Sequence, residues 1–150
     1  MIDETDRQIL RHLQRDASTS LETLAAQLSV SVNTCWRRVR RLEESGVLTS
    51  RVAICDPQKL DLSQTVFVAI RTNDHSAEWL ETFAKTVARI PEVVEFYRMA
   101  GDVDYLLKIV VASVSEYDRV YKSLIKQIEI ADVSATFAME CLKHTTELPI

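Results

Sequence analysis

Residues 29–46 have the sequence SVSVNTCWRRVRRLEESG, which carries the most informative pattern in the chain. Within it, Cys35, Val39 and Leu42 recur at helical spacing and predict a helix over residues 32–45 with one buried side. The opposite side of this helix is rich in arginine. The segment therefore predicts an amphipathic helix whose polar face is strongly basic.

Two more helices are expected before this one, over residues 3–14 and 21–28, because apolar residues recur there on one face. The residues placed to cap their first turns are Asp3 or Thr5 for the first helix and Ser20 for the second. Three short helices with a tight turn between the second and third are typical of a helix-turn-helix. Residues 47–55 then predict a small hairpin, the wing of a winged helix-turn-helix.

The second part of the chain alternates strands and helices in the order β-α-β-β-α-β. Strands are expected over residues 66–70, 93–99, 105–112 and 133–141, and helices over residues 80–90 and 117–128. This order is that of the ferredoxin-like sandwich. We therefore expect an α+β protein with a winged helix-turn-helix domain at residues 1–50, a wing and linker at 51–63, and a ferredoxin-like domain at 64–150.

The composition excludes several classes of protein. Of the 150 residues, 47% are hydrophobic and 27% are charged, which favours a packed fold over disorder. No apolar run approaches the roughly 20 residues of a membrane helix, and no signal peptide is visible, so we expect a cytoplasmic protein without a membrane partner. Three cysteines and three histidines are scattered without metal-ligand spacing, so we expect no metal and no cofactor.

The distribution of charge indicates what the protein binds. The net charge is −4, yet residues 31–51 contain five arginines and two glutamates, a local charge of +3. A local basic patch matters more for binding a polyanion than the average charge does. On the second helix of a helix-turn-helix, such a patch predicts binding of double-stranded DNA through the major groove.

The residues of this patch have different expected roles. Candidates for contacts with base edges lie near the start of the helix: Asn33, Thr34 and Arg37. Candidates for phosphate contacts are Arg38, Arg40, Arg41, Ser31 in the turn and Arg51 in the wing. Trp36 either packs against the wing, which is favoured, or contacts DNA. The alternative interpretation of the whole patch is a solvated face that pairs with Glu43 and Glu44.

Three segments give the chain a resemblance to a known family. They are IDETDRQIL at residues 2–10, RRLEESGVL at residues 40–48 and MAGDVDYLL at residues 99–107. In sequence, order and spacing the chain resembles the Lrp/AsnC, or feast/famine, transcriptional regulators of prokaryotes. The resemblance covers nearly the whole chain.

The resemblance implies a regulator that senses a free amino acid. In this family the N-terminal domain binds DNA, the C-terminal domain dimerises through its sheet, and dimers assemble into larger rings, commonly octamers. An amino acid bound between subunits alters assembly or DNA affinity. By match of motif, the effector-binding positions would be Arg98, Met99, Gly101, Asp102, Asp104 and Tyr105, with Thr136, Phe137, Ala138 and Met139 from the last strand.

The Gly101 turn also has a chemical interpretation of its own. Glycine permits positive φ and lets a ligand approach the backbone closely. Asp102 and Asp104 offer carboxylates to an α-ammonium group, and we expect Asp104 to be the main polar anchor. An ordinary polar hairpin is the alternative. Arg98 stands where many family members have an apolar residue, which argues against a simple pocket for leucine. The chain also resembles a cysteine-responsive branch of the family, so cysteine is the first candidate effector and a branched aliphatic amino acid is the second.

Two other classes of function fit the sequence less well. An enzyme is not supported, because the sequence has no Ser/His/Asp or Cys/His grouping and no glycine-rich phosphate loop. A metabolic regulatory subunit that binds amino acids without DNA is the second, and the arginine-rich helix argues against it. We therefore expect a DNA-binding transcriptional regulator and not an enzyme.

Overall fold

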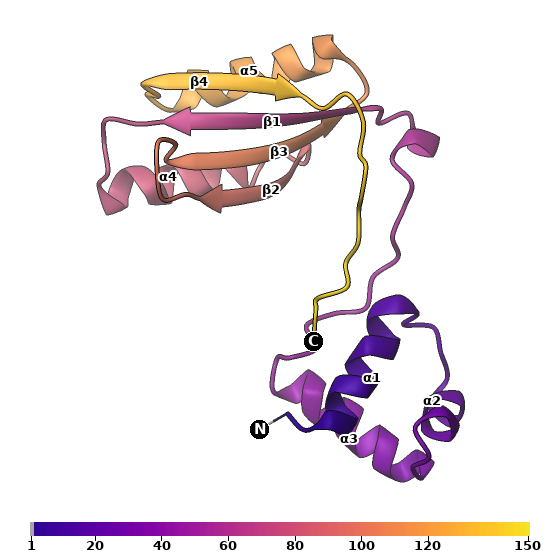
Figure 1. Cartoon of the computed structure of the whole chain (residues 1–150). Helices are drawn as coiled ribbons and strands as arrows, with labels where there is room; N and C mark the ends of the chain where they lie inside the picture. The colour runs from indigo at the N-terminus through magenta and orange to yellow at the C-terminus, as the bar shows by residue number, and fades with distance from the viewer. Residues whose placement is uncertain (1) are drawn as a thin grey trace. The chain divides into compact units, whose positions relative to one another are not determined.

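The computed structural model describes residues 2–150, except for the side chain of Gln127, and the chain forms two compact units (Figure 1). Unit 1 combines the residues up to Ile54 with Leu142–Ile150, and unit 2 is Cys55–Cys141. The division differs from the expected one at the end of the chain, because residues 142–150 belong with the helices and not with the sheet. Unit 1 is therefore built from two separate segments of the chain.

Unit 1 contains α1 (Glu4–Arg15), α2 (Leu21–Gln27) and α3 (Val32–Glu44), which confirms the predicted helix-turn-helix. Each helix begins at a polar cap whose side chain accepts a backbone N–H bond from the first turn, and these caps are Asp3, Ser20 and Ser31. The apolar faces pack into one cluster of Ile9, Leu10, Leu13, Leu24, Ala25, Cys35, Val39 and Leu42. Gly46, with φ of +72°, follows the end of α3.

The predicted wing is wrong: residues 47–55 form no strand and no hairpin. Their alternating pattern indicates the capacity to form a strand, but a strand also needs an edge to pair with. Instead, the Leu48 amide donates to the Leu42 carbonyl at 3.0 Å, which completes the end of α3. Val52 and Ile54 are largely exposed. The helix-turn-helix of this chain is therefore followed by an extended segment.

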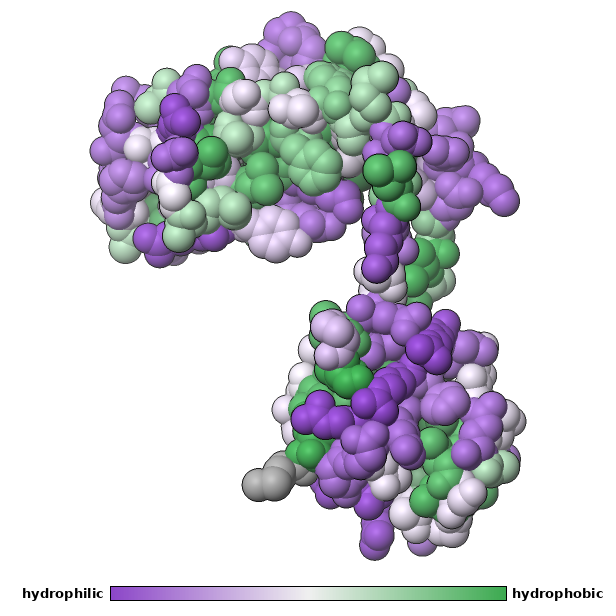
Figure 2. Space-filling view, viewed as in Figure 1, coloured by the Kyte–Doolittle hydropathy of each residue, from purple (hydrophilic) through white to green (hydrophobic). Residues whose placement is uncertain are grey.

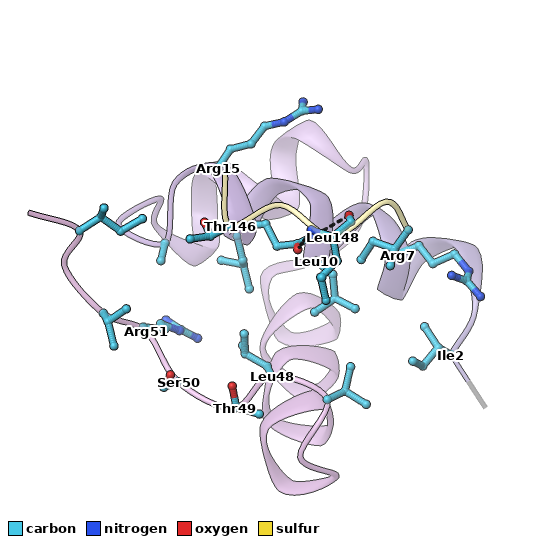
Figure 3. A pocket seen from close by; sticks show the side chains of 17 residues that line it. Ile2, Arg7, Leu10, Arg15, Leu48, Thr49, Ser50, Arg51, Thr146 and Leu148 are labelled. Atoms are coloured by element: carbon cyan, nitrogen blue, oxygen red, sulfur yellow. Dashed lines mark hydrogen bonds between the residues drawn. The ribbon is translucent and has the colours of Figure 1, made fainter. Parts of the chain in front are cut away.

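The segment Leu142–Ile150 packs along α1 (Figure 3). The Leu148 amide donates to Gln14 Oε1 at 2.6 Å, and Gln14 Nε2 donates back to the Leu148 carbonyl at 3.4 Å. Arg15 pairs with Glu147 at 3.0 Å, and Ile150 packs against the core of unit 1. Together with α1 and residues 47–54, this segment borders an apolar groove of about 420 Å³.

Unit 2 has the predicted β-α-β-β-α-β order, which confirms the α+β fold. Its elements are β1 (Gln64–Arg71), α4 (Ala77–Val87), β2 (Val93–Arg98), β3 (Tyr105–Val111), α5 (Val114–Gln127) and β4 (Asp132–Phe137), after a short 3₁₀ turn η1 (Gln58–Leu60). The strands form one antiparallel sheet in the order β2-β3-β1-β4. Strand β4 ends at Phe137, earlier than the predicted residue 141, because Phe137 already faces Val66 near the beginning of β1.

The two faces of this sheet differ. One face packs against α4 and α5 around Phe83, Val120 and Leu124, and this is the core of unit 2 (Figure 1). No helix of unit 2 covers the other face, where Phe67 and Tyr97 are exposed. Figure 2 shows apolar side chains gathered over this open face. The open face is therefore amphipathic and has no partner within its own unit.

Candidate functional site

The structure brings the predicted DNA-binding residues together on α3 and its two ends. Thr34 and Arg38 are half-buried, and the others are exposed: Ser31, Asn33, Arg37, Arg40, Arg41 and Arg51. The Ser31 hydroxyl accepts from the Thr34 amide at 3.1 Å, so it serves as the helix cap. The buried side is the predicted one, with Cys35, Val39 and Leu42 in the core. Burial raises the pKa of the Cys35 thiol.

Four of the five arginines near α3 pair with carboxylates of the same chain. On the surface, Arg40 pairs with Glu44 at 2.7 Å and Arg51 with Glu43 at 2.8 Å. Exposed pairs of this kind contribute about 0–1 kcal/mol, so a DNA phosphate can replace either carboxylate at little cost. Within residues 2–150, the Arg37 side chain has no carboxylate partner.

Arg38 and Arg41 pair instead with a carboxylate that is completely buried. Asp6, in the first turn of α1, has 0% side-chain exposure. Its Oδ1 accepts from Arg38 at 2.8 Å, and its Oδ2 accepts from Arg41 at 2.5 Å and from the Asp3 amide at 3.1 Å. Leaving a buried carboxylate without its cationic partners is costly. These two arginines are therefore fixed to α1 far more firmly than Arg40 and Arg51 are fixed to α3.

Asp3 extends the same network. Its Oδ1 caps α1 by accepting from the Asp6 amide, and its Oδ2 accepts from Arg38 at 2.7 Å. The hydrogen bond from Arg38 holds the pKa of the Asp3 carboxyl below its ordinary value, and the same bond raises the pKa of the Arg38 guanidinium. We call Asp3, Asp6, Arg38 and Arg41 the buried ion-pair network.

Sequence reasoning did not identify Asp6, although a signal was present. Asp6 stands three, four and seven residues before Ile9, Leu10 and Leu13, and so occupies the apolar face of α1. A carboxylate on a buried face requires a cationic partner. Which cation supplies it depends on the packing of α1 against α3, across more than 30 residues of sequence.

Trp36 lies on the exposed face of α3 and does not pack against a wing. The residue is 45% exposed, and the Arg40 guanidinium lies over its ring, 5.3 Å from the ring centre. This cation–π contact orients Arg40 along the helix surface. Trp36 therefore belongs to the same surface as the candidate DNA-binding arginines.

In unit 2, the predicted effector hairpin is tied to the end of β1. Gly101 has φ of +132°, a conformation that favours glycine. Asp104 Oδ2 accepts from the Thr72 amide at 2.9 Å, and Asp104 Oδ1 lies 3.9 Å from His75 Nδ1. The Asp102 carbonyl accepts from Arg71 at 2.7 Å. One Asp104 oxygen thus stabilises the turn, and the other faces a histidine.

The remaining predicted effector positions are spread over the sheet. Tyr105 is buried in an aromatic cluster with Trp79, Phe83 and Phe96, at ring-centre distances between 5.3 and 5.7 Å. Arg98 and Met99 are exposed beside the hairpin. From β4 and the residues after it, Thr136 and Met139 are exposed, Met139 to 97%, and Phe137 and Ala138 are half-buried.

A single chain does not bring the hairpin and the β4 positions together. Tyr105 faces Ile70 of β1, whereas Phe137 faces Val66 of the same strand. Four residues of strand correspond to about 13 Å. The two predicted groups therefore lie toward opposite ends of the sheet of one chain.

Other kinds of site find no support in the described part of the chain. Among those residues, no group of three or more His, Cys, Asp and Glu side chains is placed to hold a metal ion. None of the helices described is both long and apolar enough to span a membrane.

Two family models match the chain in the order of its two units. The AsnC-type helix-turn-helix domain matches residues 2–43, and the Lrp/AsnC ligand binding domain matches residues 65–148. A crystal structure of an AsnC family transcriptional regulator from Agrobacterium tumefaciens has 54% sequence identity and a TM-score of 0.94, over 98% of this chain and 96% of that one. A transcriptional regulator from Neisseria meningitidis in complex with L-Met has 27% identity and a TM-score of 0.93, over 99% and 97% of the two chains.

Curated relatives give the same picture over the whole chain. The glutamate uptake regulatory protein of Zymomonas mobilis is 52% identical over 99% of this chain and 91% of its own length. The DNA-binding transcriptional activator DecR of Escherichia coli is 44% identical over 100% of this chain and 99% of its own length. These relatives are transcriptional regulators and not enzymes. The chain therefore belongs to the Lrp/AsnC family of DNA-binding transcriptional regulators.

Proposed function

We propose that α3 is the helix that enters the major groove of double-stranded DNA, with Asn33, Thr34 and Arg37 at base edges. The observation that carries this proposal is Arg37, an exposed guanidinium near the start of α3 without a carboxylate partner among residues 2–150. Arginine forks onto guanine, and asparagine onto adenine. Ser31, Arg40 and Arg51 are exposed on α3 or beside it and would meet phosphates. Arg38 and Arg41, which the sequence also predicts at phosphates, pair with Asp6.

A gel shift with the DNA upstream of the chain's own gene tests this assignment. Arg37→Ala should weaken binding by about 1–3 kcal/mol and relax the preference at one base pair. Arg89→Ala, an exposed arginine of unit 2, is a charge-matched control that should bind as the parent does. If Arg37→Ala binds like the parent at every salt concentration, α3 does not read DNA through Arg37. If the protein binds amino acids but no DNA in this assay, the alternative function, a metabolic regulatory subunit, is favoured.

We further propose that a free amino acid is the effector, bound by the C-terminal domain. Cysteine is the first candidate and a branched aliphatic amino acid the second. The names of two relatives, a glutamate uptake regulator and a complex with L-Met, support an amino-acid ligand and add glutamate and methionine to the test. A ligand at 100 times its Kd stabilises the folded state by about 2.7 kcal/mol. Thermal shift with the twenty amino acids should identify it, and no shift at millimolar concentration contradicts the proposal.

We also propose that two copies pair through the open sheet face, and that dimers assemble further, up to an octamer. An exposed, partly apolar sheet face is a surface on which a second copy can bury Phe67 and Tyr97. Pairing would bring a second chain to an effector site that one chain leaves divided. Light scattering should therefore show a dimer or a multiple of it at micromolar concentration. We also infer that the regulator is cytoplasmic, because a protein that binds the chromosome of a prokaryotic cell acts there.

A further inference from the structure

Building on the proposed role of α3, we propose that Asp6 limits the number of phosphate contacts that the helix-turn-helix makes with DNA. It keeps Arg38 and Arg41 away from the phosphate backbone, so that the affinity for DNA of any sequence stays low. The base contacts of Arg37 and Asn33 then supply a larger share of the binding to a preferred sequence. Asp6 itself is buried and would not touch DNA.

The geometry of the buried ion-pair network supports this role. Both oxygens of Asp6 are occupied, one by Arg38 and the other by Arg41 and the Asp3 amide. If Arg41 bound a phosphate instead, the fully buried Asp6 carboxylate would lose one of its cationic partners. The carboxylates of Glu43 and Glu44 are exposed, so water replaces Arg51 or Arg40 when these arginines move to a phosphate. Arg40 and Arg51 are thus exchangeable, and Arg38 and Arg41 are withheld.

The spacing of the network explains why α1 can act on α3 in this way. Asp3 and Asp6 are one helical turn apart, as are Arg38 and Arg41, so one turn of each helix faces the other. The two aspartates neutralise the two arginines within this contact. The Arg41 side chain is nevertheless 56% exposed, so it lies at the surface. It would add a phosphate contact if Asp6 were replaced by an uncharged residue.

The consequence for DNA binding can be estimated from counterion release. Each phosphate neutralised adds about 0.9 to the steepness of log K against log salt. At about 0.1 M salt, one added contact therefore raises affinity for any duplex roughly five- to tenfold. Contacts of this kind carry no sequence information. Releasing Arg41 should accordingly raise the affinity for every duplex by a similar factor.

The experiment compares Asp6→Asn with Glu44→Gln in the full chain, since each removes one negative charge beside α3 while keeping the side-chain shape. The probes are a duplex that the parent selects from a random pool and a duplex of scrambled sequence, titrated over a series of salt concentrations. Asp6→Asn should bind both duplexes roughly five- to tenfold more tightly at about 0.1 M salt, with a salt slope steeper by about one. Glu44→Gln should leave the salt slope unchanged, because Arg40 already exchanges the exposed Glu44 for a phosphate.

Two outcomes overturn the proposal: an unchanged salt slope in Asp6→Asn, or a weakening of both duplexes, which marks a purely structural role. Should Asp6→Asn fail to fold, Arg41→Gln and Arg37→Gln decide the question, because Asp6 keeps Arg38 as its partner in both. A withheld Arg41 leaves the salt slope unchanged in Arg41→Gln, while Arg37→Gln weakens binding of the selected duplex and relaxes the preference at one base pair. If Arg41→Gln lowers the slope by about one, the inference is wrong and the proposed function stands. If neither changes DNA binding, the proposed function of α3 fails as well.

Discussion

Asp6 of unit 1 and Asp104 of unit 2 are both acidic residues at predicted functional regions, but their surroundings are opposite. The Asp6 side chain is fully buried and receives two guanidinium groups and a backbone amide. The Asp104 side chain is 29% exposed, and one of its oxygens accepts a single backbone amide. In the candidate DNA-binding face, four of the five arginines are therefore paired with carboxylates of the same chain. The candidate effector region has an accessible carboxylate, and its two parts lie apart in one chain.

The largest expected effect tests whether the two units are independent. Phe83 is fully buried in the core of unit 2, so Phe83→Ala should destabilise that unit by about 3–5 kcal/mol. Leu13→Ala in unit 1 should cost about 2–5 kcal/mol there. In a Trp36→Phe background, Trp79 fluorescence reports unit 2 during denaturant unfolding. The Trp79 transition should shift with Phe83→Ala and not with Leu13→Ala, and equal shifts would mean that the two cores unfold together.

A second prediction concerns the charge of Asp104. Asp104→Asn keeps an oxygen that accepts from the Thr72 amide but removes the charge that would bind an α-ammonium group. The variant should keep its melting temperature without ligand and lose the roughly 2.7 kcal/mol that an effector at 100 times its Kd supplies. Asp118→Asn is the control, because Asp118 is an exposed carboxylate of α5 outside the predicted effector positions. A full thermal shift in Asp104→Asn would contradict the anchor role.

The smallest expected effect is the pH dependence of the buried ion-pair network. The pKa of Asp3 in the folded chain lies below its ordinary value of 3.8. Asp3 therefore stabilises the fold fully above that ordinary value, and the contribution is lost as the pH falls through the lowered pKa. Asp3→Asn keeps the helix cap and removes the charge. Parent and variant should differ in unfolding midpoint near neutral pH and converge in strong acid, and a constant difference would assign the effect to the cap.

Local patterns predicted most of the fold. Helix periodicity and the polar residues Asp3, Ser20 and Ser31 located α1, α2 and α3, since capping and amphipathicity depend on near neighbours. The order of strands gave the ferredoxin-like sheet. The wing at residues 47–55 was mispredicted because a strand depends on a pairing edge, which the sequence does not specify.

The candidate sites were predictable to different degrees. The arginine-rich face of α3 follows from the helical period alone. The pairing of Arg38 and Arg41 with Asp6 depends on how two helices pack, and the roles of these arginines could not be separated from that of Arg37 by spacing. Likewise, the turn at Gly101 is visible in the sequence, but the burial of Tyr105 depends on three aromatic rings from other elements.

The segment Leu142–Ile150 restricts how such regulators can exchange parts. Because unit 1 is made of two separate pieces of chain, a recombination event with one crossover near Ile54 would join α1 of one parent to the terminal segment of another. Gln14 and Arg15 would then meet a foreign Leu148 and Glu147. A functional hybrid with a new sheet unit needs two crossovers, on either side of residues 55–141. Inheritance of the helix-turn-helix together with its distant end is therefore favoured over simple domain shuffling.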